Sequence, residues 1–149
     1  MTDNMDKYRI VATLTENQVS DLMDLYKNEF WCDNRKREDV VRMLAATDVT
    51  IGLVDEGDGV PPRELRLIGF TRVITDFVYR AMIFDVIVHP TQRKSGLGRV
   101  LMDAVANHPK LQSVENISLN CLPKMIPFYE RWGFTSNVGE MKYMRRLKP

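Results

Sequence analysis

Hydrophobic and polar residues follow one another in short stretches that switch between the strand period and the helix period. Tyr8 to Thr13 alternates and predicts a strand, and Thr15 to Gln18 has the capping-box form that begins a helix. The apolar residues that follow predict a first helix that ends near Trp31. A second, shorter helix is predicted over Arg37 to Ala46. The apolar face of the first helix consists of Val19, Leu22, Met23, Tyr26 and Phe30.

The middle of the chain predicts three strands. Val49 to Val54 and Leu65 to Ile74 are separated by Glu56 to Gly59 and two prolines, which predict a loop. Ala81 to Val88 is the third apolar run. It ends before Pro90, because proline cannot continue the hydrogen-bonded ladder of a central strand.

The last third of the chain predicts two helices and two strands. A glycine loop leads into a helix that begins near Leu97, and Asn116 to Cys121 then predicts a strand. Pro123 suits the start of the next helix and Gly133 its end, and Gly139 to Arg146 predicts a final strand. The order of elements is that of an α/β (α+β) protein whose helices interrupt a sheet.

Size and charge narrow the possible functions. At 149 residues and 17.3 kDa, with 44% hydrophobic residues, the chain suits one domain over residues 1–149. Its 21 basic and 20 acidic residues leave a net charge of +1, which predicts neither a nucleic-acid partner nor a membrane partner. The charged beginning of the chain and the lack of a long apolar run predict a soluble, cytoplasmic protein.

The two cysteines, Cys32 and Cys121, lie far apart and outside any CxxC pair. Their spacing predicts neither a disulfide framework nor a metal site, and both are expected to be buried thiols.

The loop before the third predicted helix has the form of an anion-binding site. Gly96 and Gly98 would let the backbone approach a phosphate group closely, at the positive end of the helix. Arg93, Lys94 and Arg99 would supply cations around it. The sequence therefore predicts a ligand that carries phosphates, although a helix that merely begins with glycines remains an alternative.

Two common nucleotide-binding motifs do not fit this loop. A P-loop requires Lys followed by Ser or Thr after its last glycine, but Arg99 follows Gly98 here. A dinucleotide-binding fingerprint requires a third small residue where Leu101 stands.

Arg93 to Gly98 fits the R/Q-x-x-G-x-G/A pattern of the GNAT acetyltransferases, and Phe128 to Phe134 resembles their FYExxGF segment. Ile68 to Asp76 extends the resemblance upstream, so that it covers most of the chain from the first helix to Phe134. The resemblance implies a GNAT fold with a central mixed, mostly antiparallel sheet of six to seven strands and about four helices. It also implies acetyl-coenzyme A (acetyl-CoA) as cosubstrate.

The resemblance further implies that acetyl passes directly to an amine in one ternary complex. The strand Asp85 to Val88 should splay away from Ile117 to Cys121, and the pantetheine arm should lie in the gap, bound by exposed backbone groups. The coenzyme-binding residues implied in this way are Val86, Ile87, Val88, Arg93, Lys94, Ser95, Gly96, Leu97, Gly98, Arg99, Asn120 and Tyr129.

Tyr129 is the candidate for the acid that protonates the departing thiolate, because the family has a tyrosine at this point and a phenol can donate a proton. The alternative is a core role, because Tyr129 shares a helical stripe with Phe128 and Trp132. Asp85 and Asp76 are candidates for proton transfer from the amine, although such residues also cap loops or pair with arginine. A metal is not expected.

Phe30, Trp31 and Arg35 are the candidate substrate-binding residues, because the first helices of GNAT proteins wall the acceptor pocket. A packed aromatic pair beside a solvated arginine is the alternative. The predicted substrate is a small-molecule primary amine. Two other functions remain open, a protein or peptide N-acetyltransferase and a non-catalytic coenzyme A-binding module. A homodimer is possible through the last strand, with Met141, Tyr143 and Met144 at its surface.

Overall fold

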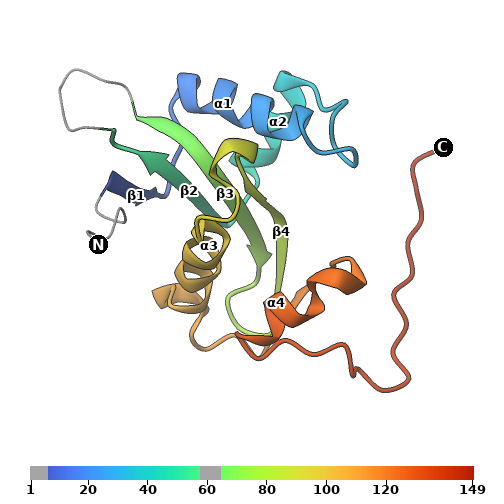
Figure 1. The fold of residues 1–149 in the computed structure, drawn as a ribbon. Helices are drawn as coiled ribbons and strands as arrows, with labels where there is room; N and C mark the ends of the chain where they lie inside the picture. The colour runs from blue at the N-terminus through green and yellow to red at the C-terminus, as the bar shows by residue number, and fades with distance from the viewer. Residues whose placement is uncertain (1–6, 58–64) are drawn as a thin grey trace.

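The computed structural model describes residues 7–57 and 65–149 and contains one five-stranded sheet in the order β1-β2-β3-β4-β5 (Figure 1). The strands are β1 (Tyr8–Val11), β2 (Val49–Asp55), β3 (Arg66–Thr75), β4 (Arg80–Val88) and β5 (Asn116–Leu119). The α-helices are α1 (Glu16–Lys27), α2 (Arg37–Ala45), α3 (Leu97–Ala106) and α4 (Ile126–Glu130). Short 3₁₀ turns, η2 (Pro90–Gln92), η3 (Pro109–Leu111) and η4 (Pro123–Met125), complete the order.

The sheet is mixed and mostly antiparallel, as predicted. β1, β2, β3 and β4 pair with their neighbours in antiparallel fashion, and only β4 and β5 pair in parallel. The four helices match the expected number among the described residues. The loop predicted over Glu56 to Gly59 and the following prolines lies mainly outside the described residues.

Helix α1 begins where the capping box predicts and ends earlier than expected. The Gln18 backbone N–H donates to Oγ1 of Thr15, and the Thr15 N–H donates back to Oε1 of Gln18, at 3.2 and 3.0 Å. Asn28 caps the C-terminal end, so the predicted end near Trp31 is wrong. Phe30 therefore lies beyond the helix with 81% of its surface exposed.

Two hydrophobic cores hold helices to opposite faces of the sheet. Helices α1 and α2 cover one face, where Leu22 and Tyr26 of α1 pack on Phe70 of β3. Helix α3 covers the other face, where Leu101 packs on the sheet and Tyr129 of α4 joins the same core. Figure 1 shows α1 and α2 together at one side of the sheet and α3 across the other.

The predicted final strand, Gly139 to Arg146, is absent, so the expectation of six to seven strands is wrong for the described residues. Residues 135–149 are exposed throughout and run away from the sheet as an extended segment (Figure 1). Alternating side chains alone do not make a strand, because a strand also needs a partner that accepts its backbone hydrogen bonds.

Two smaller expectations have mixed outcomes. Cys32 is buried, as predicted, but Cys121 is exposed, because β5 ends at Leu119 and leaves Cys121 beyond the sheet. Among residues 7–57 and 65–149, no helix is long and apolar enough to cross a membrane.

Candidate active site

A β-bulge in β4 shapes one side of the site. Phe70 pairs with Ile87 and Arg72 pairs with Phe84, so Thr71 faces two residues of β4 instead of one. Asp85 is in the left-handed region with φ of 57°, which is uncommon for a residue other than glycine. The bulge lets successive side chains reach the same neighbour: the Phe84 ring lies 4.8 Å from the Arg72 guanidinium carbon, and Asp85 binds the same guanidinium.

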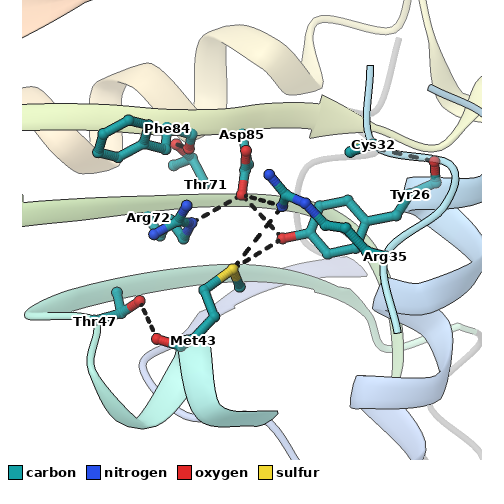
Figure 2. A network of polar contacts seen from close by, with 9 residues as sticks. All are labelled: Tyr26, Cys32, Arg35, Met43, Thr47, Thr71, Arg72, Phe84 and Asp85. Atoms are coloured by element: carbon teal, nitrogen blue, oxygen red, sulfur yellow. Dashed lines mark hydrogen bonds and ion pairs between the residues drawn. The ribbon is translucent and has the colours of Figure 1, made fainter. Parts of the chain in front are cut away.

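Asp85 forms the centre of a buried polar network between α1, the α1–α2 loop and the sheet (Figure 2). Its Oδ2 accepts hydrogen bonds from the Tyr26 hydroxyl at 3.0 Å, from Arg35 at 2.9 Å and from Arg72 Nε at 2.8 Å. The Asp85 side chain is only 4% exposed. The network therefore fixes the bulge against two other segments of the chain.

The charges of this network hold Asp85 in its ionised form. Burial by itself raises the pKa of Asp85, but the hydrogen bonds and positive charges of Arg35 and Arg72 outweigh burial and hold the pKa below its ordinary value. The pKa of Tyr26 is raised by burial and by the adjacent carboxylate. A carboxylate with a lowered pKa and three donors is a weak base, and its geometry favours a positioning role.

Strands β4 and β5 separate next to the bulge. Their parallel pairing runs from Arg80 opposite Asn116 to Ile83 opposite Leu119, and it does not continue beyond that pair. Residues 84–88 of β4 therefore have no ladder partner on the β5 side, which is the splay that the sequence predicts. Val86 and Val88 lie along this open edge, and Asn120 is exposed just past the end of β5.

The glycine loop is built at the start of α3, next to the end of β4. Gly96 caps the helix with φ of 83°, and a Cβ atom added to it would meet no atom within 4 Å. The backbone is thus open to a ligand at this point. Gly98 has a different surrounding, because a Cβ there would lie 3.4 Å from the Phe128 ring. Gly98 therefore permits close packing of α3 on α4.

The cations predicted around the loop differ in their availability. Arg93 forms an ion pair with Glu29 at 2.7 Å, and its Nε donates to the Val88 carbonyl at 3.2 Å. Lys94 and Arg99 are exposed and have no ion pair or hydrogen bond with the described residues. Of the three predicted cations, Lys94 and Arg99 are therefore free for a ligand, while Arg93 is partly neutralised.

Two other loop residues have structural positions. The Ser95 hydroxyl donates to the Gln92 carbonyl, which closes the turn before the helix. The Leu97 side chain is fully buried in the core beneath α3, so only its backbone can contribute to a site on the surface. Ile87 is also buried, on the α1 side of the sheet.

Tyr129 is 8% exposed and packs against Phe128 and Phe134 with ring centroids 5.0 and 6.3 Å apart. Its hydroxyl has no hydrogen bond to the described residues. Burial, together with the charge that Cys121 would carry as a thiolate, raises the pKa of Tyr129 to about 12. The phenol is therefore protonated at neutral pH and close to the point where the chain leaves β5.

Asp76 occupies the turn between β3 and β4, several residues from Arg72 and Asp85 along both strands. Its Oδ1 accepts hydrogen bonds from the backbone N–H groups of Val78, Tyr79 and Arg80 in the β3–β4 hairpin. These bonds, that of Arg80 first, hold the pKa of Asp76 below its ordinary value. The position and the partners of Asp76 are those of a turn-forming residue, which is the alternative that the sequence leaves open.

The α1–α2 loop brings the predicted substrate residues to the surface beside the Asp85 network. Phe30 and Trp31 are 81% and 46% exposed, so they do not form a packed pair inside the core. The Arg35 guanidinium carbon lies 4.6 Å from the Tyr26 ring centroid and 5.7 Å from that of Trp31. Arg35 is thus held by a carboxylate and two rings rather than fully solvated.

Three residues of the site were not found from the sequence: Tyr26, Glu29 and Arg72. Tyr26 lies on the apolar stripe of α1 and was expected only in the core. Glu29 and Arg72 stand in segments of ordinary charged composition, and their partners Arg93 and Asp85 lie 64 and 13 residues away along the chain. A pattern within a few neighbouring residues of the sequence cannot predict pairs that are formed between distant segments.

Comparison with known proteins gives the family. Residues 16–134 match the acetyltransferase (GNAT) family model. The chain is 30% identical over 127 residues to the uncharacterized N-acetyltransferase ycf52 of Porphyra purpurea, covering 82% of this chain and 71% of that protein. It is 27% identical over 110 residues to the chloroplastic serotonin N-acetyltransferase 2 of Oryza sativa subsp. japonica, covering 74% of this chain and 54% of that protein.

A solved structure of a GNAT-family protein from Xanthomonas campestris pv. campestris has a TM-score of 0.75 and 27% identity, and the match covers 95% of this chain and 94% of that one. Glucosamine-6-phosphate N-acetyltransferase from Arabidopsis thaliana shares the fold with a TM-score of 0.67 at 17% identity. The chain belongs to the GNAT family of acetyltransferases and is an acetyl-transfer enzyme.

Proposed function

We propose that this enzyme transfers acetyl from acetyl-CoA directly to the primary amine of a small molecule in one ternary complex. One observation carries the proposal: β4 parts from β5 after Ile83 and Leu119, next to an α3 N-terminus that Gly96 leaves open. An extended ligand with a phosphate end and an arm that forms hydrogen bonds would match both features.

The residues present fit coenzyme A in two respects. Free backbone N–H groups and the helix dipole at the start of α3, with Lys94 and Arg99 nearby, suit a pyrophosphate. The unpaired edge of Val86 to Val88 suits the amide groups of pantetheine. When bound, acetyl-CoA supplies the activated acetyl group.

Residues of the chain would supply the proton transfer and the positioning that the reaction also requires. The Tyr129 hydroxyl has no partner among the described residues and stays protonated, so it can donate a hydrogen bond and a proton to a thiolate. Asp85 does not need to move a proton in this scheme, because its three donors fix β4 at the bulge. The amine can lose its proton to water or to another base without any change in these roles of Tyr129 and Asp85.

Small-molecule acetylation is favoured over a non-catalytic role because Tyr129 is in place and its hydroxyl is unengaged. A relative named serotonin N-acetyltransferase also acts on a small amine, as its name states. The exposed rings of Phe30 and Trp31 beside Arg35 offer a surface for such an acceptor.

Calorimetric titration with acetyl-CoA tests the proposal most directly. Gly96→Glu places a side chain and a negative charge in the proposed phosphate path and should abolish micromolar binding. Gly139→Glu is a matched control, because Gly139 also has a left-handed φ, 68°, and no atom within 4 Å of an added Cβ. Absence of acetyl-CoA binding to the folded wild-type protein would overturn the proposed function.

We also propose that two copies associate through the C-terminal segment, residues 139–147. Met141, Tyr143, Met144 and Leu147 of this segment are 72%, 70%, 88% and 69% exposed. In the part of the chain that the structure describes, β5 ends the sheet and has a ladder partner only on the β4 side, so its outer edge can accept another strand. A segment with strand-forming alternation and an open strand edge complement one another between copies.

A further inference from the structure

A hollow of about 370 Å³ lies at the end of the sheet where β3, β4 and β5 run side by side. Ile74, Met82 and Ser118 are in register across the three strands and form one row of its lining. The next row on the same face is the pair Arg72 and Phe84. The hollow, whose lining also includes Asp76 and Arg80, therefore ends one row short of Arg72, about 7 Å along the strands.

The same row lies at the point where β4 and β5 separate. Phe84 follows Ile83, the last residue of β4 that pairs with β5. A molecule that fills the hollow and extends one further row along the strands would come to the Arg72 side chain and to the point where β4 and β5 separate. The hollow, the guanidinium and the gap form one continuous stretch of this face of the sheet.

Arg72 and Arg35 have unused hydrogen-bond donors at this place. Among the described residues, Arg72 donates only through Nε and Arg35 only through one terminal nitrogen. No fully buried nitrogen lacks a partner in the described part of the chain, so the remaining N–H groups reach the surface. The two side chains are only 14% and 29% exposed, which strengthens an interaction with an anion.

We infer that Arg72 and Arg35 bind a carboxylate of the acceptor, so that the substrate is a small primary amine that also carries a carboxylate. This inference rests on the proposed function and names the acceptor class for it. Two guanidinium groups share the single carboxylate of Asp85, which leaves one positive charge uncompensated in the network. One carboxylate balances that charge, whereas a phosphate dianion would exceed it.

Both arginines are held in a fixed orientation by neighbouring side chains. The Asp85 oxygen holds Arg72 Nε, and the Phe84 ring lies beside the guanidinium, so the terminal N–H groups of Arg72 are fixed in direction. Tyr26 and Trp31 hold Arg35 in the same way between two rings. Fixed donors lose little conformational freedom when an anion binds.

The test measures thiol release from acetyl-CoA with a series of ω-amino acids as acceptors, from glycine to 6-aminohexanoate. Each amino acid is compared with its own carboxamide, which lacks the negative charge. The best carboxylate should exceed its amide in kcat/KM roughly 10- to 100-fold, the range of a charge-assisted hydrogen bond. Arg72→Met should remove this preference, so that the acid and its amide are used with similar kcat/KM. Arg42→Met is the control, because Arg42 is an exposed arginine on α2.

Two further variants and probes keep the inference open to refutation. If Arg72→Met fails to fold, Arg72→Lys serves in its place. It retains the positive charge and should prefer the acid over the amide, but less strongly than the wild type does. 3-Aminopropyl phosphate separates the two kinds of anion, and its preferred use would overturn the carboxylate assignment. Equal use of acids and amides by the wild-type enzyme would also overturn it.

Failure of the proposed function gives a different result. If the folded protein does not bind acetyl-CoA in calorimetry, the acetyl-transfer proposal fails, and the anion site is then tested by binding alone. Arginine Nε–H resonances should shift in NMR titrations with 4-aminobutyrate and stay unchanged with its amide, and the shifts should vanish in Arg72→Met. Identical spectra with both probes would refute the anion site.

Discussion

Arg93 of the glycine loop donates to Glu29 of the α1–α2 loop at 2.7 Å. One side chain thereby connects the predicted phosphate site with the segment that presents Phe30 and Trp31. The Arg93 Nε bond to the Val88 carbonyl adds the end of β4 to the same junction. The proposed coenzyme and acceptor sites therefore share a contact that a negatively charged ligand would compete for.

Glu29→Gln should raise the affinity for acetyl-CoA, because Arg93 would no longer be neutralised and could turn to the phosphates. An exposed ion pair is worth at most about 1 kcal/mol, so the gain in affinity should be about fivefold or less. Calorimetry at low and high salt measures it, with Glu38→Gln on α2 as control. A weaker affinity in Glu29→Gln would instead mean that Glu29 holds Arg93 in the binding position.

Asp85→Asn should reduce the free energy of unfolding at neutral pH by less than the roughly 3–5 kcal/mol of a fully buried pair, because both partly buried guanidinium groups lose their counter-charge. Asparagine tolerates the left-handed backbone of residue 85, so the substitution tests the charge. Because the folded-state pKa of Asp85 lies below its ordinary value, its stabilisation is present above about pH 4 and is lost as the pH falls through the folded-state pKa.

Urea unfolding at pH 7 and near pH 3 measures this effect. The difference between wild type and Asp85→Asn should shrink toward the lower pH, whereas Asp39→Asn, at an exposed ion pair, should differ little from wild type at either pH. A difference that does not change with pH would show that Asp85 does not stabilise the fold through its charge.

Tyr129→Phe should lower kcat roughly 10²- to 10⁴-fold if the phenol is the proton donor. Acetyl-CoA binding and the melting temperature should change little, because the hydroxyl has no partner within residues 7–57 and 65–149. With a pKa of about 12, the wild-type phenol should cause no loss of rate up to about pH 11. Tyr79→Phe, at an exposed tyrosine, is the control. Full activity of Tyr129→Phe would restrict Tyr129 to packing.

Removal of residues 139–149 should convert a dimer into a monomer in analytical ultracentrifugation. The melting temperature of the truncated chain at low concentration should stay close to that of the full chain, since these residues are exposed at every position. Met141→Asp should weaken the dimer without shortening the chain. A full-length protein that sediments at 17.3 kDa at all concentrations would contradict the proposed association.

Much of the fold could be predicted from local sequence signals. The capping box at Thr15 and the glycine at position 96 act on their immediate neighbours, so their effects are visible in a few residues. The strands β2, β3 and β4 have continuous apolar runs because helices cover both of their faces. Their predicted bounds differ from the observed ones by at most one residue at each end.

The site itself depends on contacts that no local pattern contains. The left-handed backbone of Asp85 comes from its bulge, and the bulge comes from pairing with β3 and from donors on α1 and the α1–α2 loop. The C-terminal segment shows the reverse case, since residues 139–146 have the composition of a strand but no described partner within the chain. Long-range partners decide both outcomes.

The bulge divides β4 into two parts, and the strand pairing on either side of it sets separately which face each side chain occupies. Up to Ile83, β4 pairs in register with β5, and from Ile87 on, its described pairing is with β3 alone. Deletion of residue 85 would leave Val86 opposite Thr71 in a plain ladder, but it would remove the carboxylate that Tyr26, Arg35 and Arg72 bind. A deletion elsewhere in β4 would shift the register by one residue and turn the side chains on one side of it to the opposite face. Related chains should therefore accept substitutions along β4 far more readily than a change in its length, so length variation during evolution should be confined to the hairpin before Arg80.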